Sequence, residues 1–240
     1  MVWTTKRRWL LWFGGMTLWL TLIIQPENRG ILRLAALALF LSVYAGGIAL
    51  AWPKRPLRIS LIALAIVLVV PFLLPGRNPD AARLREAYTQ SLAAYEGTTY
   101  SWGGENRFGI DCSGLVRRGF ISACVKEGLR TANGSLLRQA CDLWWHDASA
   151  KAMGEEYRGE TVLLLDTPSI NQLDHARLLP GDIAVTENGV HTLVYIGDNR
   201  WMQADPGRGR ASYEHVPVKD SGWFSTPVHI LRWKLLHLSE

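Results

Sequence analysis

Three long apolar runs in the first 76 residues constrain the fold of this chain most strongly. They cover residues 9–25, 34–53 and 59–76, and they contain no charged side chain. Each is close to the roughly 20 residues that a helix needs to cross a ~30 Å hydrocarbon core, the first and third being near the short limit. A helix buried in a soluble domain usually carries a polar stripe, which these runs lack. The sequence therefore predicts an all-α membrane anchor, residues 1–76, with three transmembrane helices.

A cleaved signal peptide is the alternative explanation for the first run. Lys6, Arg7 and Arg8 would then form its basic leading region. The residues after the run, 25–28, read Gln-Pro-Glu-Asn and offer no small-residue cleavage site. We therefore expect the first run to remain as an uncleaved span.

The distribution of charge excludes one class of partner. The chain carries a formal charge of +5, which by itself suggests nucleic acid. Residues 1–80, however, hold nine of the 26 basic side chains and two of the 21 acidic ones. The remaining 160 residues are slightly acidic, with 17 basic and 19 acidic side chains. The basic character belongs to the anchor, so we expect no nucleic-acid partner.

The same basic residues predict the orientation of the anchor, because cytoplasmic loops are enriched in Lys and Arg. The basic residues before the first run and between the second and third are Lys6, Arg7, Arg8, Lys54, Arg55 and Arg58. The loop between the first two runs holds Arg29 and Arg33. This bias predicts a cytoplasmic N-terminus and, after three crossings, a domain of residues 77–240 on the outer face of the membrane.

The pattern after residue 79 is that of a mixed domain. Apolar residues at helical spacing predict helices over 80–95, from 111 to about 127, and over about 135–150. Runs typical of strands follow at 161–165, 182–186, 190–196, 201–204 and 228–233. Helices first and strands later indicate an α+β fold rather than alternating α/β units.

Cys112 differs in its setting from the other two cysteines, Cys124 and Cys141. Asp111 is a good N-cap, so Cys112 lies in the first turn of a helix, where the helix dipole stabilises a thiolate. Cys124 has the surroundings of a small buried hydrophobe. Cys112 and Cys124 lie ~18 Å apart along one helix and cannot pair. A disulfide between Cys124 and Cys141 stays open, because the sequence does not determine their geometry.

A thiolate nucleophile needs a base and a group that orients the base. Among six histidines, most of them expected at ordinary surface or core positions, His191 precedes a hairpin turn at residues 197–200. Pairing centred on Gly197 would place His191 opposite Gln203, and a slip of two residues would offer Asp205 instead. A triad of Cys112, His191 and Gln203 is one interpretation of these residues.

Four motifs in order resemble those of the NlpC/P60 family of papain-like cysteine peptidases. They are Tyr-Ser-Trp-Gly-Gly at 100–104, Asp-Cys-Ser-Gly-Leu-Val at 111–116, Leu-Pro-Gly-Asp at 179–182, and His191 with Tyr-Ile-Gly at 195–197. The resemblance covers roughly residues 80–205. It implies a papain-like domain with an antiparallel sheet that cleaves peptidoglycan stem peptides, typically between γ-D-glutamate and the following diamino acid. A bacterial inner-membrane protein with a periplasmic or other extracytoplasmic catalytic domain is then expected.

The resemblance also implies roles for individual residues. Cys112 is the nucleophile, His191 the general base and then acid, and Gln203 the residue that orients His191. Relatives often have His at the third position, with Asn or Gln also found. The backbone N–H of Cys112 would stabilise the oxyanion. Residues lining the substrate cleft would be Tyr100, Asp111 and Ser113, and an acidic side chain there can hold the free amine of the stem peptide. Asp111 has an alternative role as a helix cap.

Residues 141 to about 176 form a longer segment than the family pattern has before Leu-Pro-Gly-Asp. Trp144 and Trp145 within it are either core aromatics or a docking surface for glycan or lipid. A multi-span anchor is also unusual for these hydrolases. The inserted segment puts the substrate in question more than the chemistry.

The leading hypothesis is a membrane-anchored cysteine hydrolase that cleaves peptidoglycan peptides. The alternatives are a cysteine amidase or acyltransferase acting on a lipid or protein, and a non-catalytic wall-binding scaffold. Residues 205–210 are basic and rich in glycine but open no helix, so we expect a polar loop near the cleft and no phosphate-binding loop. Cys, His and carboxylate residues show no metal-ligand spacing, so no metal or other cofactor is expected.

Overall fold

The computed structural model describes residues 5–28 and 30–237, so residues 1–4, 29 and 238–240, among them Arg29 of the first loop, lie outside it. The α-helices are α1 (Thr5–Ile24), α2 (Gly30–Ala51), α3 (Arg55–Leu73), α4 (Ala81–Ala93), α5 (Cys112–Arg130), α6 (Gly134–Trp145), α7 (Ala150–Gly154) and α8 (Lys234–His237). The strands are β1 (Glu105–Asn106), β2 (Gly109–Ile110), β3 (Thr161–Thr167), β4 (Ile183–Thr186), β5 (Thr192–Gly197), β6 (Arg200–Asp205), β7 (Arg210–His215) and β8 (Val228–Trp233). Single 3-10 turns are η1 (Tyr157–Gly159), η2 (Ile170–Gln172), η3 (His175–Arg177) and η4 (Gly222–Phe224).

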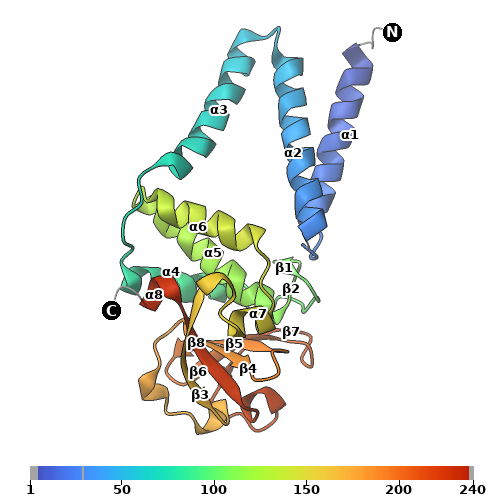
Figure 1. Cartoon of the computed structure of the whole chain (residues 1–240). Helices are drawn as coiled ribbons and strands as arrows, with labels where there is room; N and C mark the ends of the chain where they lie inside the picture. Colours follow the sequence, from blue (N-terminus) through green and yellow to red (C-terminus); the bar gives the residue numbers. More distant parts are fainter. Residues whose placement is uncertain (1–4, 29, 238–240) are drawn as a thin grey trace.

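A six-stranded sheet forms the centre of the domain that follows the first three helices. Its strand order is β3-β8-β4-β5-β6-β7, and neighbouring strands are antiparallel. Helices α4, α5 and α6 lie between this sheet and the N-terminal helices (Figure 1). The prediction of an α+β fold with an antiparallel sheet is confirmed.

Aromatic packing holds the helical layer on the sheet. Phe120 of α5 stacks on Trp233 of β8, with ring centroids 4.5 Å apart and planes 2° from parallel. Tyr88 of α4 meets Phe120 edge-on at 5.3 Å. Each such pair contributes roughly 0.5–1.5 kcal/mol beyond the area that it buries. The packing determines where α5 lies, and α5 begins with Cys112.

Two predicted elements differ from the structure. The helix expected to reach residue 150 ends at Trp145, because His146 adopts an extended backbone (φ −92°, ψ 91°). Strand β7 was not predicted, since its sequence, Arg-Ala-Ser-Tyr-Glu-His, has a weak apolar alternation. It pairs with β6 along its whole length, from Arg200 opposite His215 to Asp205 opposite Arg210. Residues 206–209 form the turn of this hairpin, within the predicted polar loop.

Helices form over all three apolar runs, but the prediction of three spans is supported for two of them. Among the described residues, α2 and α3 are long and apolar enough to cross a membrane. Helix α1 carries Lys6, Arg7 and Arg8 near its start. Its uncharged part therefore covers roughly 24 Å at ~1.5 Å per residue, which is short of the ~30 Å core.

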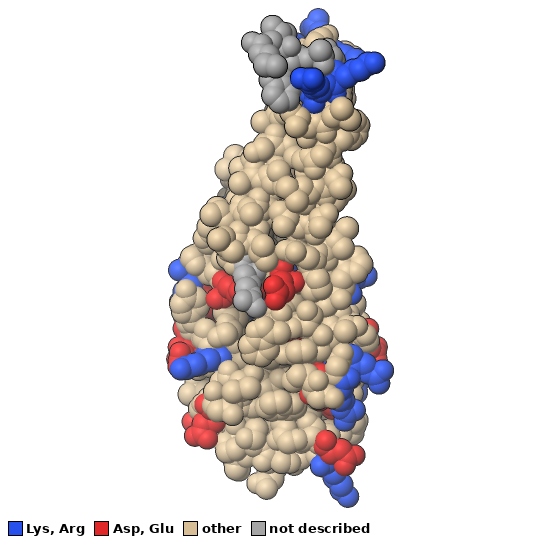
Figure 2. All heavy atoms as spheres, turned by 90° about the vertical axis from the view of Figure 1, so that its right-hand side faces the viewer, with Lys and Arg blue, Asp and Glu red and all other residues tan. Residues whose placement is uncertain are grey.

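The three N-terminal helices point away from the domain. Both the start of α1 and the turn between α2 and α3 lie at the far end, and the loop between α1 and α2 lies against the domain (Figure 1). Figure 2 shows Lys and Arg side chains at that far end, then a stretch of uncharged surface, then mixed charges over the domain. The more basic segments, before the first apolar run and between the second and third, thus lie at the end of the helices far from the domain. The loop between the first two runs lies at the opposite end, next to the domain.

Hydrogen bonds join the segment after α3 to the domain. Asn133, which caps α6, bonds the backbone of Arg77 twice, through N–H to Oδ1 at 3.1 Å and Nδ2 to O at 2.8 Å. The loop between α1 and α2 also contacts the domain. Asn28 N donates to Gly103 O at 3.2 Å, and Glu105 N donates to Pro26 O at 3.0 Å. The chain thus meets its domain at two places.

Candidate active site

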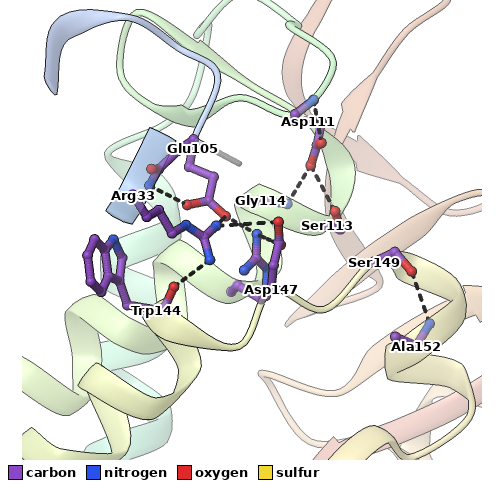
Figure 3. Close-up of polar contacts among 12 residues, drawn as sticks. Arg33, Glu105, Asp111, Ser113, Gly114, Trp144, Asp147, Ser149 and Ala152 are labelled. Atoms are coloured by element: carbon purple, nitrogen blue, oxygen red, sulfur yellow. Dashed lines mark hydrogen bonds and ion pairs between the residues drawn. The ribbon is translucent and has the colours of Figure 1, made fainter. Parts of the chain in front are cut away.

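Helix α5 begins at the base of a cavity, and its first turn is built around Asp111. The Asp111 carboxylate accepts from Gly114 N at 2.5 Å, from Ser113 Oγ at 3.0 Å and from Gly103 N at 2.8 Å (Figure 3). The predicted N-cap is confirmed. The same carboxylate ties the Gly103–Gly104 segment to the start of α5.

The glycines of the two motifs are needed for this close approach. A Cβ on Gly114 would lie 2.2 Å from the carbonyl oxygen of Gly104, and a Cβ on Gly104 would lie 2.5 Å from that of Gly109. Both neighbours are backbone atoms that cannot move aside independently. Asp111 N also donates to Gly104 O at 3.1 Å. Gly104 is therefore enclosed between the β1–β2 hairpin and helix α5.

Cys112 opens onto a cavity of about 710 Å³. Tyr100, Asp111 and Ser113, the sequence-predicted cleft residues, line it together with Trp102, Glu105, Arg117, Asp147 and residues 149–152 and 188–190. Cys112 itself is 7% exposed. Its Sγ lies 4.0 Å from Val190 O, directly before His191 in the chain. The structure thus brings the predicted nucleophile next to the segment that carries the predicted base.

His191 and Gln203 contact each other in the interior. His191 Nε2 lies 2.8 Å from Gln203 Oε1, and the two residues are 1% and 0% exposed. An amide oxygen can accept but not donate, so Nε2 carries the proton and Nδ1 holds the free lone pair. His191 N also donates to Thr186 Oγ1 at 3.0 Å. The imidazole is therefore held in the tautomer that a general base requires.

The predicted register of the hairpin is wrong by two residues. Tyr195 pairs with Trp201 and Val194 with Met202, which places Gln203 diagonal to His191 rather than opposite it. Because side chains alternate faces with a period of two, this shift keeps Gln203 on the same face as His191. The Gln203 side chain is long enough to reach the His191 ring from this diagonal position. Asp205 instead accepts from Trp223 Nε1 at 3.2 Å and from Gly207 N at 2.8 Å.

Trp223 was not singled out in the sequence. Its ring stacks on that of His191, with centroids 4.3 Å apart and planes 22° from parallel. It lies in η4, 32 positions along the chain from His191, and no local spacing connects the two. Trp223 keeps water from one face of the imidazole.

Burial sets the protonation of the two reactive groups. It raises the pKa of the Cys112 thiol to about 12, with a smaller contribution from Asp111 and an opposing one from backbone N–H groups, Thr192 first. It lowers the pKa of His191 to about 4, against opposing effects of Gln203 and Asp205. The backbone N–H groups at the helix start favour the thiolate, as expected, but desolvation of the thiol has the larger effect. At neutral pH the pair is a thiol and a neutral imidazole.

Two further features of the predicted segment 141–176 are resolved. Trp144 is half-buried against the core, whereas Trp145 is 47% exposed. His175 Nε2 accepts from Trp201 Nε1 at 3.0 Å, and Trp201 belongs to a buried hydrophobic cluster with Leu193 and Ile230. In the described part of the chain, all three cysteines are free thiols, so Cys124 and Cys141 do not pair.

Comparison with known proteins points to one family. A model of the NlpC/P60 family matches residues 97–232. A probable endopeptidase NlpC of Escherichia coli (strain K12) is 25% identical over 176 residues, which are 66% of this chain and 94% of that protein.

Solved structures are similar at lower identity. NlpC1 of Trichomonas vaginalis is 18% identical with a TM-score of 0.40, over 62% of this chain and 43% of that one. The peptidoglycan hydrolase RipB of Mycobacterium tuberculosis is 20% identical with a TM-score of 0.37, over 62% and 65%. The match thus spans less than half of the Trichomonas protein.

Proposed function

The chain belongs to the NlpC/P60 family of cysteine peptidases, and on that premise we propose that it is a membrane-anchored endopeptidase of peptidoglycan stem peptides. The observation that carries the proposal is the arrangement around the cavity. Cys112 lies at a helix N-terminus with its Sγ 4.0 Å from Val190 O, and the next residue, His191, is buried and held through Nε2 by Gln203. A binding scaffold has no need of this combination.

In the proposed reaction, Cys112 is the nucleophile and His191 Nδ1 is the base. As Sγ attacks the scissile carbonyl carbon, its proton passes to Nδ1, and Gln203 Oε1 holds the other ring N–H in place. The backbone N–H of Cys112 stabilises the oxyanion. The imidazolium then protonates the leaving amine, which leaves an acyl-thioester on Cys112. Water activated by His191 hydrolyses the thioester and restores the free thiol.

For the substrate, we propose the bond between γ-D-glutamate and the following diamino acid. Tyr100, Asp111 and Ser113 line the same cavity as Cys112. The Asp111 carboxylate accepts its three hydrogen bonds from uncharged donors. The protonated free amine of the stem peptide would add a charged donor to it. One carboxylate can then serve both as helix cap and as amine ligand.

We further propose that α1 crosses the membrane with α2 and α3. Helix α1 packs on α2, and Trp12 Nε1 donates to Val43 O at 2.8 Å. Lys and Arg side chains at the start of a short span can extend to the interface. An odd number of crossings then holds the catalytic domain on the outer face of a bacterial inner membrane, with the basic far end of the helices in the cytoplasm.

Digestion of purified muropeptides by the full chain in detergent micelles tests the activity. Mass spectrometry is expected to show products cut after γ-D-glutamate. Absence of new products would overturn the proposal, as would acyl transfer to lipid without muropeptide cleavage.

For topology, a reporter fused after Glu240 is expected to be active in the periplasm, and activity confined to the cytoplasm would contradict the orientation.

The pH dependence follows from the burial of His191. A base must be unprotonated, and burial lowers its pKa to about 4 from the ordinary 6.5, so we expect kcat/KM to stay level from pH 7 to about 5 and to fall near pH 4. Trp223→Ala uncovers one ring face, raises this pKa toward 6.5 and moves the acid limb upward. Rates between pH 3.5 and 8, with folding monitored by fluorescence, measure the acid limb of the wild type and of the variant. A wild-type limb near 6.5 would contradict the assignment of His191 as a buried base.

A further inference from the structure

Arg33 lies near the start of α2, an otherwise apolar helix, and yet its side chain is buried in contact with the catalytic domain. It is 1% exposed. Its Nη2 lies 2.7 Å from Glu105 Oε1 and 3.5 Å from Asp147 Oδ2, and its Nη1 donates to Trp144 O at 2.5 Å (Figure 3). A guanidinium is costly to bury unless carboxylates compensate it, and here they come from the other side of the interface.

Glu105 is the residue on which the contacts from the anchor converge. It is 5% exposed, and its Oε1 accepts from both Arg33 and Arg117. Its Oε2 accepts from Asn28 Nδ2 at 2.9 Å, and its backbone N–H donates to Pro26 O. The loop between α1 and α2 therefore binds both the side chain and the backbone of β1.

Arg117 and Asp147 complete a balanced group of four charges, which with Arg33 and Glu105 we term the Arg33 quartet. Arg117 is 2% exposed and lies on α5, five residues after Cys112. Its Nη2 lies 2.6 Å from Asp147 Oδ1. Burial lowers the pKa of Arg117 to about 10, opposed by Asp147 and reinforced by Arg33 and Arg118. Glu105, Arg117 and Asp147 also line the cavity that holds Cys112.

The contacts from the anchor continue to the nucleophile. Asn28 bonds Gly103 O, and Arg33 bonds Glu105, so the anchor holds both sides of Gly104. Gly104 O in turn accepts from Asp111 N, next to Cys112. A shift of this segment would carry the N-terminal turn of α5 with it, since Gly103 N donates to the Asp111 carboxylate and Asp111 N donates to Gly104 O.

We propose that Arg33 is a positioning residue for the reaction, acting through Glu105 and Arg117 on the N-terminal turn of α5. The loop between α1 and α2 and the start of α2 then support the active site from outside the cavity, in addition to tethering the domain. The rate measurement for this inference rests on the proposed function. The inference also explains why a single catalytic domain carries several N-terminal helices packed against it rather than a flexible tether.

Kinetics of the full chain in detergent micelles test the proposal. R33M is expected to lower kcat roughly 10- to 100-fold with little change in KM, because displacement of reacting groups by ~1 Å costs rates of this order. R33M/E105Q is expected to recover part of the loss, since Arg117 and Asp147 then remain as a balanced pair. R33K keeps the charge but not the planar fork of the guanidinium, so it is expected to lower kcat roughly three- to tenfold. If R33M does not accumulate as folded protein, the kcat of R33K tests the proposal instead.

R58M is the matched control. Like Arg33, Arg58 donates to a tryptophan carbonyl, that of Trp52, and it lies 4.5 Å from the centroid of the Trp52 ring, but at the far end of the helices. Its kcat is expected to equal that of the wild type. A purely structural role for Arg33 would lower thermal stability and leave kcat per folded molecule unchanged; that result, or equal kcat for R33M and R58M, would overturn the proposal.

A second measurement separates this inference from the proposed activity. If the wild type cleaves no muropeptide, the proposed function fails, and the rate of alkylation of Cys112 by iodoacetamide decides the inference. Cys141→Ser removes the exposed thiol first, and peptide mass spectrometry identifies the modified residue. An alkylation rate that differs at least threefold between R33M and R58M would support positioning through the quartet, and equal rates would overturn it.

Discussion

Replacement of Cys112 by alanine is expected to lower kcat for muropeptide cleavage by at least roughly 10⁴-fold, which is the scale found when a catalytic triad loses its nucleophile. The loss follows from the chemistry, because no acyl-thioester can form without Sγ. Binding is expected to persist, since Tyr100, Asp111 and Ser113 still line the cavity. Initial rates of product formation, measured by mass spectrometry, provide the comparison.

Cys141→Ser is the matched control for this variant. Cys141 is an exposed thiol on α6 and is absent from the cavity lining among the described residues. Its replacement is expected to leave the rate unchanged. Retention of more than roughly 1% of wild-type kcat by C112A would reject Cys112 as the nucleophile, because a triad nucleophile contributes far more than this.

Asp182→Ala is expected to destabilise the domain by about 3–5 kcal/mol, the usual cost of removing one partner from a buried ion pair. Asp182 is 1% exposed and accepts from Arg232 Nε at 2.7 Å and Nη2 at 3.0 Å. It also accepts from Leu179 N at 2.8 Å. The carboxylate therefore joins the residue before β4 to β8 and shapes the Leu-Pro-Gly-Asp turn, so the motif has a structural role here.

Asp166→Ala serves as the control, because Asp166 also contacts a β8 residue across the sheet. Its Oδ1 lies 2.6 Å from His229 Nδ1, but the carboxylate side chain is 67% exposed. Exposed pairs contribute about 0–1 kcal/mol, so the variant is expected to stay close to wild type. Denaturant unfolding of both variants in micelles measures the difference. Equal midpoints for D182A and D166A would contradict a stabilising role of the buried pair.

The candidate site was partly predictable from local sequence. Asp111 and Cys112 are adjacent, and capping depends on backbone groups within three residues, so the start of α5 could be deduced directly. His191 and Gln203 belong to one hairpin, which limits their separation to a choice of register. The register chosen was wrong by two, and the bond between them still formed because the error preserved the face of the sheet.

Other parts of the site could not be deduced in this way. Trp223 reaches His191 through the packing of η4, and Arg33 reaches Glu105 across 72 positions of the chain. In the sequence Arg33 had one meaning, a loop cation that bears on membrane orientation. Its burial against Glu105 and Asp147 depends on how the N-terminal helices pack against the domain. The spacing of apolar residues in the sequence does not predict this packing.

The sequence by itself determined the apolar N-terminal helices, the α+β class and the capped helix that begins with Cys112. These follow from interactions between residues a few positions apart, where period, capping and turn chemistry act. Only the tertiary structure decided the Arg33 quartet, the cover that Trp223 provides and the direction of the pKa shifts. Those depend on contacts between distant segments and on burial, and at Cys112 the desolvation of the thiol outweighs the helix dipole on which the local sequence argument relied.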